Sequence, residues 1–286
     1  MYSLHLPSAS ASDTYTTAVG TIRKELSRIP YTTAKPSVLA SCEAFDAFAA
    51  ASQLHLAVGS DFDVAGLAGA DMVALYDNQF SSRVGTAAIR NSIKNAAINA
   101  LCPYCGEGYA SELDHFLPKT VFAGTTVHPA NLIPCCGDCN FAKRDYMPDQ
   151  DSPAVLHPYF DGALFKTPWL SARLDHGALD TPKVRFVIEL CQPNAELEAR
   201  LNQHIKIFKL QKRFRAWAAQ ELNNFEILLA SDEGQSMGLE QAQQHLRRNA
   251  ISLSGGRVNS WERATYTAMA ESHWYLSDHL GLTSRA

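Results

Sequence analysis

One stretch decides how this chain is organised: residues 101–146, which read LCPYCGEGYASELDHFLPKTVFAGTTVHPANLIPCCGDCNFAKRDY. It holds five of the seven cysteines, in the clusters CPYC and CCGDC. Two Cys-x-x-Cys pairs separated by a short insert are typical of a zinc site with four thiolate ligands. The spacing predicts that one structural Zn²⁺ binds Cys102, Cys105, Cys136 and Cys139. Cys135 is the spare thiol, because two adjacent cysteines rarely bind one ion, and we expect Cys42 and Cys191 to be small core residues.

The composition limits where such a protein works. An odd number of cysteines, crowded into one region, favours metal thiolates in a reducing compartment over a disulfide framework. The N-terminus lacks the cationic and apolar regions of a signal peptide, and no apolar run approaches the roughly 20 residues that span a bilayer. We therefore expect a cytoplasmic protein without a membrane partner. The formal net charge is −4 in 286 residues, so contacts with a polyanion must come from local basic patches.

The flanking segments predict helices and one hairpin. In residues 1–100 the pattern predicts a helix from Thr17 to Ile29 that ends at Pro30, with further helices over 36–58, 71–76 and 84–100. After the cysteine-rich core, 169–174 and 184–190 predict a β-hairpin. One long helix is expected from Asn194 to about residue 229, followed by helices over 239–252 and 261–280. The expected fold class is α+β: a mainly helical protein that encloses a zinc-stapled core, with regions 1–100, 101–148 and 149–286.

The insert between the cysteine pairs carries the candidate chemistry. Residues 113–117 alternate as in a strand, 131–134 predict a second strand, and a helix is expected from Cys139. Strand alternation directs Asp114 and His115 to opposite sides unless a bulge redirects one of them. Asn140 is expected at the start of the helix.

This arrangement resembles the HNH (ββα-metal) nuclease family in its zinc-containing form. The matching segments are CPYC, ELDHFLPK, NLIPCC and CGDCNFAK, within 101–146. The resemblance implies that His115 is the general base that activates water and that Asn131 orients the loop. It also implies that Asp114 and Asn140 are ligands of a catalytic metal ion. A looser similarity to bacterial HNH proteins, some from phage-defence operons, implies a role in antiviral defence.

Two oxygen ligands leave an ion open to water and substrate, which suits Mg²⁺ or Mn²⁺. The expected function is therefore a metal-dependent HNH endonuclease that hydrolyses DNA, with RNA as the alternative substrate. Phosphate contacts are expected from Lys119, Lys143 and Arg144 beside the core. A second basic set on the long helix is Lys206, Lys209 and Arg213, for which an ordinary solvated face is the alternative.

Two other functions fit the same residues. A non-catalytic zinc module that binds nucleic acid or protein would keep the cysteines but has no need for Asp114, His115 and Asn140 together. An effector subunit could work only beside a regulatory protein from the same operon, which the negative net charge favours. The sequence assigns no role to His128 or Asp138.

Overall fold

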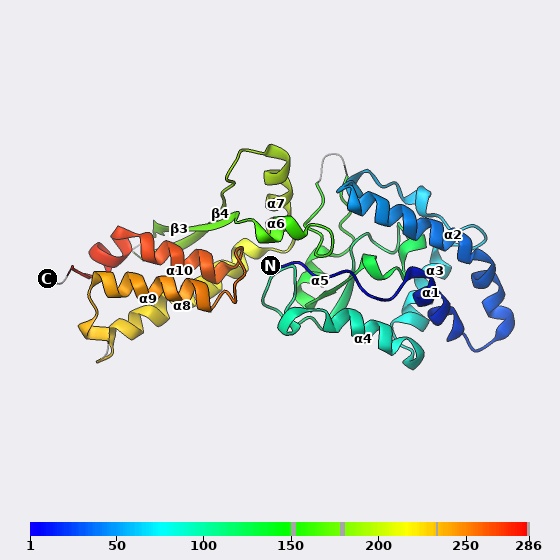
Figure 1. Ribbon diagram of the computed structural model, residues 1–286, viewed down its shortest axis with the longest axis horizontal. Helices are drawn as coiled ribbons and strands as arrows, with labels where there is room; N and C mark the ends of the chain where they lie inside the picture. The colour runs from blue at the N-terminus through cyan, green and yellow to red at the C-terminus, as the bar shows by residue number, and fades with distance from the viewer. Residues whose placement is uncertain (150–152, 178–180, 233, 285–286) are drawn as a thin grey trace. The chain divides into compact units, whose positions relative to one another are not determined.

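The computed structural model describes residues 1–149, 153–177, 181–232 and 234–284, which form two compact units (Figure 1). The first unit is Ser3–Gly162, and the second is Met1–Tyr2 together with Ala163–Ala286. The α+β class is confirmed, since the described residues hold many helices and two antiparallel sheets of two strands each. Among these residues, no helix combines the length and the apolar character that a membrane crossing requires.

The units divide the chain differently from the three predicted regions. The helical N-terminal region and the cysteine-rich region share one unit, and that unit extends to Gly162 instead of ending at 148. The segment that follows the core stays with it because its side chains pack there. The Tyr159 hydroxyl donates a hydrogen bond of 2.9 Å to the Leu132 carbonyl. The His157 ring lies 4.1 Å from the Phe116 ring, between centroids.

Four helices build the N-terminal part of the first unit: α1 (Ala11–Gly20), α2 (Glu25–Ala50), α3 (Gly69–Leu75) and α4 (Ala87–Asn95). A π-helical turn, Tyr76–Phe80, continues α3. Short 3-10 turns lie at Leu54–Leu56, Gly59–Phe62, Val84–Thr86 and Ile98–Ala100. Apolar side chains from these helices and from the core hairpin form one buried cluster, which includes Val38, Phe80, Ile93 and Leu132.

Helix α2 corrects the prediction that Pro30 ends a helix. It begins at Glu25 and runs through both Pro30 and Pro36. A proline inside a helix removes a hydrogen bond and costs about 3 kcal/mol. Burial offsets this cost, because the helix places one apolar stripe in the core; its buried members include Ala34, Val38, Cys42, Phe45 and Ala49.

The cysteine-rich region folds as strand, strand, helix, in the predicted order. Strand β1 (Glu112–His115) pairs antiparallel with β2 (Leu132–Cys135), and α5 (Gly137–Lys143) follows. His115 lies opposite Leu132 in the register. Two 3-10 turns, Ala123–Thr125 and Pro129–Asn131, lie in the connection between the strands.

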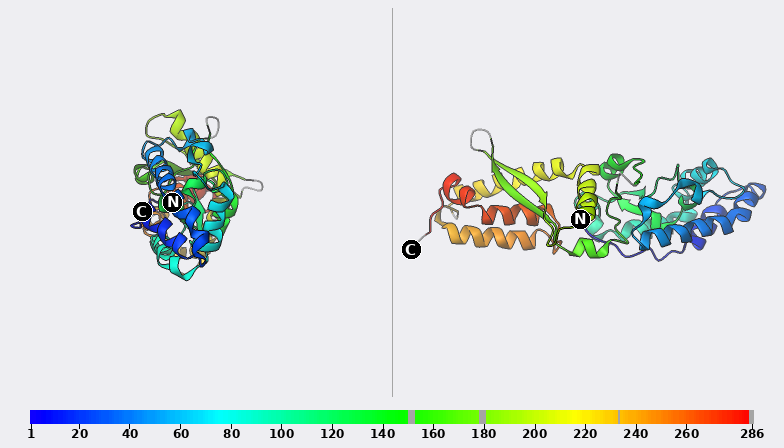
Figure 2. Two further views of the ribbon diagram at one scale, coloured as in Figure 1. Left: turned by 90° about the vertical axis from the view of Figure 1, so that its right-hand side faces the viewer. Right: turned by 90° about the horizontal axis from the view of Figure 1, so that it is seen from above.

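The second unit is a hairpin with helices beside it. Its elements are α6 (Gly162–Lys166), β3 (Leu170–His176), β4 (Pro182–Ile188), α7 (Ala195–Ile207), α8 (Leu210–Ala230), α9 (Leu239–Ser252) and α10 (Trp261–Glu271). A 3-10 turn, Gly234–Ser236, precedes α9, and a π-helical turn, Trp274–His279, follows α10. Helices α8 and α10 lie along the hairpin (Figure 2). Buried Asn259 fixes the start of β3, because its Oδ1 accepts hydrogen bonds from the Trp169 and Leu170 amides at 2.8 and 3.1 Å.

The predicted long helix from Asn194 is two helices. Lys209 separates them with a left-handed backbone, φ 53°. In a continuous helix Phe208 and Leu210 would point about 200° apart, on opposite faces. The break allows both side chains to be fully buried. The last predicted helix is also shorter than expected, because α10 ends at Glu271.

Candidate functional site

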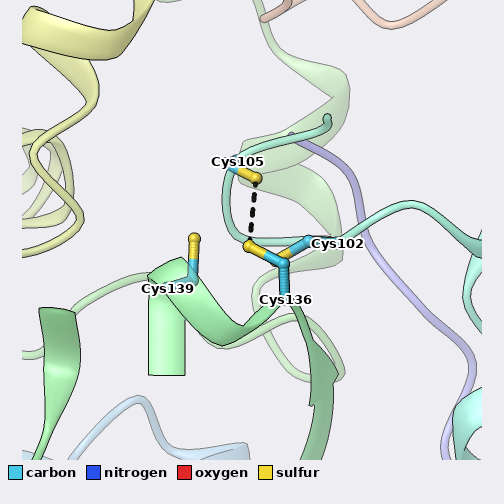
Figure 3. A group of neighbouring side chains, drawn as sticks. All are labelled: Cys102, Cys105, Cys136 and Cys139. Atoms are coloured by element: carbon cyan, nitrogen blue, oxygen red, sulfur yellow. Dashed lines mark hydrogen bonds between the residues drawn. The ribbon is translucent and has the colours of Figure 1, made fainter. Parts of the chain in front are cut away.

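Four cysteine side chains converge between the loop after Leu101 and the start of α5 (Figure 3). The sulfur atoms of Cys102, Cys105, Cys136 and Cys139 all lie within 4.8 Å of one another, and all four side chains are buried. The Sγ atoms of Cys105 and Cys136 are 3.9 Å apart. These are the four predicted ligands, so the sequence spacing identified a cluster that could hold a metal ion such as zinc.

Local backbone geometry positions the first cysteine pair. The Cys102 amide donates to the Gly108 carbonyl at 2.7 Å, and the Gly106 amide donates to the Cys102 carbonyl at the same distance. Gly106 has φ 85°, a left-handed conformation that closes the turn without a Cβ clash. The Gly108 amide lies 3.4 Å from the Cys105 sulfur, where it stabilises a thiolate.

The second pair lies at the start of α5, since Cys136 is its N-cap residue. The chemistry of the four thiols fits a cation. Hydrogen bonds from the neighbouring thiols hold the pKa of Cys105 far below its usual range and lower the pKa of Cys136 to about 7. Burial raises the pKa of Cys102, and its sulfur neighbours raise the pKa of Cys139. Without a cation the four buried thiols are therefore not all deprotonated, whereas a bound Zn²⁺ would stabilise the thiolate form of each ligand and offset two of the four negative charges.

Asp114, which the resemblance implies to be a metal ligand, makes an ion pair within the first unit. Its carboxylate is buried and faces Lys143 of α5, whose Nζ lies 3.2 Å from Oδ1 and 3.1 Å from Oδ2. The Tyr104 hydroxyl donates to Oδ2 at 3.0 Å, and the Lys143 ammonium also donates to the His115 carbonyl at 2.6 Å. Burial raises the pKa of Asp114, while Lys143 and Tyr104 act in the opposite direction.

The Asn140 side chain contacts Glu112 and not Asp114. Its Nδ2 donates to the Glu112 carboxylate at 2.6 Å, at the other end of β1. The predicted Mg²⁺ ligand pair is therefore not assembled, because an ammonium occupies the cation position beside Asp114. Glu112 and Asp114 share one face of the strand, so α5 contacts them through Asn140 and Lys143, three residues apart.

His115 points to the other face of β1, as strand alternation predicted. Its Nε2 lies 2.8 Å from the Thr126 carbonyl. A carbonyl only accepts, so Nε2 carries the proton and Nδ1 keeps its lone pair. Among the described residues, Nδ1 has no hydrogen-bond partner, and this atom is not completely buried. Burial lowers the pKa of His115 to about 3, which keeps the imidazole neutral at physiological pH.

The π-helical turn after α3 supplies neighbours of His115 that the sequence did not reveal. The Tyr76 ring packs edge-on against the imidazole, with centroids 4.3 Å apart. Lys119 forms an ion pair with Asp77 and lies 4.9 Å from the centroid of the Tyr76 ring. Lys119 lowers the pKa of His115 and Asp77 raises it, so both charges act on the imidazole. π-helical turns occur often at functional sites, and the spacing of apolar residues in the sequence gives no signal for them.

Asn131 organises the loop between the strands. It is fully buried, and its Oδ1 accepts a hydrogen bond of 2.7 Å from the Leu117 amide. Its Nδ2 donates to the Leu117 carbonyl and to the Thr125 hydroxyl, both at 3.1 Å. These bonds hold the segment that carries Thr126, the partner of His115. Asn131 therefore links both ends of this loop through its side chain.

The six predicted nucleic-acid contacts differ in exposure. Lys143 is 2% exposed and ion-paired, so it cannot reach a phosphate as folded, and this prediction is wrong. Arg144 is exposed and lies 4.5 Å from the Phe141 ring centroid. Lys206 and Lys209 are exposed in the second unit, and the guanidinium of Arg213 lies 5.3 Å from the Trp217 ring centroid.

The remaining polar and sulfur residues have simple positions. Nε2 of His128 lies 2.9 Å from the Asp46 carboxylate. Asp138 is exposed in the first turn of α5. Cys135 is buried at the end of β2, outside the group of four. Cys42 is buried as predicted, whereas Cys191 is exposed and is not a core residue.

Comparison with known proteins shows a partial similarity to a phage protein. The chain is 33% identical over 128 residues to protein ea31 of Escherichia phage lambda. That alignment covers 43% of this chain and 42% of the phage protein, so the match spans less than half of each. No family model matches the chain, and no solved structure matches it.

Proposed function

We propose that the first unit is a zinc-stapled phosphodiester hydrolase of the HNH type, an endonuclease with DNA as its expected substrate. The observation that carries the proposal is the histidine: a neutral imidazole whose Nε2–H is held by the Thr126 carbonyl and whose Nδ1 is left to accept a proton. It lies at the end of the first strand of a strand–strand–helix unit beside four clustered cysteines. The resemblance to HNH nucleases implies the same combination.

The proposed reaction uses His115 as general base. Nδ1 removes a proton from water while the water oxygen attacks phosphorus. The bond from phosphorus to the leaving oxygen breaks, and the leaving oxygen takes a proton from solvent water to become a hydroxyl. A positioned base contributes about 10²–10⁴-fold to the rate when its pKa lies near the operating pH, so the proposal requires the bound anionic phosphate to raise the lowered pKa of His115. Lys119, beside His115, supplies positive charge to the phosphate. Asp114 receives no ligand role, because Lys143 neutralises it. Zn²⁺ at the four thiolates is structural, and it holds the first cysteine pair against α5.

The buried Asp114–Lys143 pair favours a second candidate, a nuclease subunit that works only beside a partner protein. In that case the acidic side chain becomes available to Mg²⁺ or Mn²⁺ only when the partner moves α5. Antiviral defence is the biological setting that we propose for either form.

The test is cleavage of plasmid DNA and of single-stranded RNA by the zinc-loaded protein. It is run with and without Mg²⁺ or Mn²⁺, and with and without the proteins of neighbouring genes. His115→Ala should lower cleavage by about two orders of magnitude or more while zinc content stays at one ion per chain. Cys135→Ser, a change outside the four-cysteine group, is the matched control and should cut normally. A His115→Ala protein that cuts at the parent rate would refute the assignment of the base.

A further inference from the structure

A pocket lies in the first unit, at the end of α4. It has a volume of about 410 Å³ and is lined by Asn91, Lys94, Asn95, Ala97, Ala100, Tyr109, Ala110 and Ser111. Sites of about 300–1,000 Å³ commonly hold small organic ligands. None of these lining residues belongs to the cysteine cluster or contacts His115 among the described residues.

The side chains around this pocket are available for a ligand. Tyr109 is 71% exposed, although a large aromatic ring on a surface usually finds a partner. Lys94 is half-buried and makes no ion pair within the described part of the chain. The amides of Asn91 and Asn95 and the hydroxyl of Ser111 add donors and acceptors at the rim.

The backbone that forms the pocket wall is unusual and firmly held. Asn99 and Ala100 have φ 52° and 56°, a left-handed conformation that is unfavourable for residues with a Cβ. The Ala110 amide donates to the Ala100 carbonyl at 2.8 Å, and Leu101 pairs with Tyr109 in an antiparallel bridge. The cysteine turn therefore fixes the position of Tyr109. Strained backbone that its surroundings hold in place occurs often at ligand sites.

We infer that this pocket binds one nucleotide of a single-stranded nucleic acid. An exposed tyrosine ring is a platform on which an unpaired base stacks. Asparagine amides hydrogen-bond to base edges, and a lysine without an acidic partner binds phosphate. The three kinds of side chain needed for a nucleotide thus surround one space of suitable size.

The pocket lies close along the chain to the proposed cleavage site at His115. The link between the two sites rests on the proposed function. Ser111 in the pocket precedes β1, and His115 ends that strand. Four residues of strand span about 13 Å, a distance that a short nucleic-acid segment can bridge. Helix α4 has contacts on both sides: Arg90 donates to the carbonyl of Phe80, whose ring stacks on Tyr76, and Lys94 lines the pocket one turn later.

The experiment measures binding of a fluorescent single-stranded 12-nucleotide oligonucleotide to the full zinc-loaded chain by anisotropy, without added Mg²⁺. Tyr109→Ala should weaken binding by about 5- to 150-fold, the contribution of one stacked base. Tyr109→Phe keeps the ring and should bind within twofold of the parent. Lys94→Ala should reduce the slope of log affinity against log salt concentration by about 0.7.

Phe141→Ala is the matched control, since Phe141 is also an exposed aromatic residue of this unit, at 65% exposure. It should bind like the parent, and all variants should retain zinc. The inference is overturned if the parent binds no oligonucleotide, if Tyr109→Ala binds within twofold of the parent, or if Phe141→Ala loses as much.

A free mononucleotide added as competitor tests whether the pocket binds free nucleotides or only nucleotides within a strand. Displacement of the oligonucleotide at millimolar concentration would show that the pocket also takes free nucleotides. Tyr109-dependent oligonucleotide binding without such displacement would restrict it to strands, and either result supports a nucleotide site. A parent protein that binds in this way but never cuts DNA or RNA would contradict the proposed hydrolase and leave the nucleotide site standing.

Discussion

The buried pair between Asp114 and Lys143 makes the sharpest prediction about this protein. Lys143→Met removes an ammonium that lies 3.1 Å from the Asp114 carboxylate and keeps a side chain of similar length. At that distance the attraction between the charges is about 5 kcal/mol with an effective dielectric constant of about 20. The desolvation of both groups offsets part of that attraction. Removal of one partner, however, leaves the other charge buried and unpaired, which typically costs about 3–5 kcal/mol.

The expected result is therefore a loss of about 3–5 kcal/mol in the free energy of unfolding of the first unit. All four tryptophans lie in the second unit, at positions 169, 217, 261 and 274, so their fluorescence does not report this change. Urea titration should instead be followed by release of zinc to a chromogenic chelator, and by circular dichroism. The zinc-release midpoint should move to lower urea concentration.

Two further variants complete the test. The double variant Asp114→Asn/Lys143→Met removes both charges and should recover most of the loss, as expected for a coupled pair. Lys119→Met is the control, because its partner Asp77 is about half exposed and such pairs contribute only about 0–1 kcal/mol. A Lys143→Met protein within about 1 kcal/mol of the parent would refute the buried pair. So would a double variant as unstable as the single one.

Three other outcomes follow from the same geometry. Burial lowers the pKa of His115 to about 3 in the folded protein, whereas the same side chain titrates near 6.5 in the unfolded chain. Between these two values only the unfolded chain binds the proton, so the free energy of unfolding is highest above pH 6.5 and decreases as the pH falls toward 3. The loss should reach up to about 1.4 kcal/mol per pH unit, and His115→Asn should flatten the measured curve; an unchanged curve would contradict the neutral imidazole. Cys136→Ser should lose zinc and loosen the first unit, because zinc bound by thiolates contributes about 10–16 kcal/mol in small peptides. Cys135→Ser is the control, and elemental analysis should find one zinc ion per chain in that variant. The triple alanine substitution of Lys206, Lys209 and Arg213 should weaken DNA binding equally for all DNA sequences and reduce the salt dependence of the affinity. Unchanged affinity would identify this helix face as an ordinary solvated one.

Much of the first unit could be predicted because its signals are local. The cysteine spacing identified the four clustered thiols. The patterns in 113–117 and 131–134 predicted both short strands, which the structure places at 112–115 and 132–135, and alternation predicted the opposite directions of Asp114 and His115. Ligand spacing and residue periodicity depend on a few neighbouring residues, so they can be read without knowledge of the fold. The same holds for helix 239–252 and for the second hairpin.

Tertiary contacts decided what each candidate side chain can do. Lys143 has the sequence pattern of an exposed helix residue, yet contacts with Asp114 and the His115 carbonyl bury it. Tyr76 approaches His115 from 39 positions earlier in the chain. Packing also overrode local rules at Pro30, which lies inside a helix, and at Lys209, which divides one. The charge and reach of a side chain depend on which distant groups surround it, and only the folded chain determines that environment.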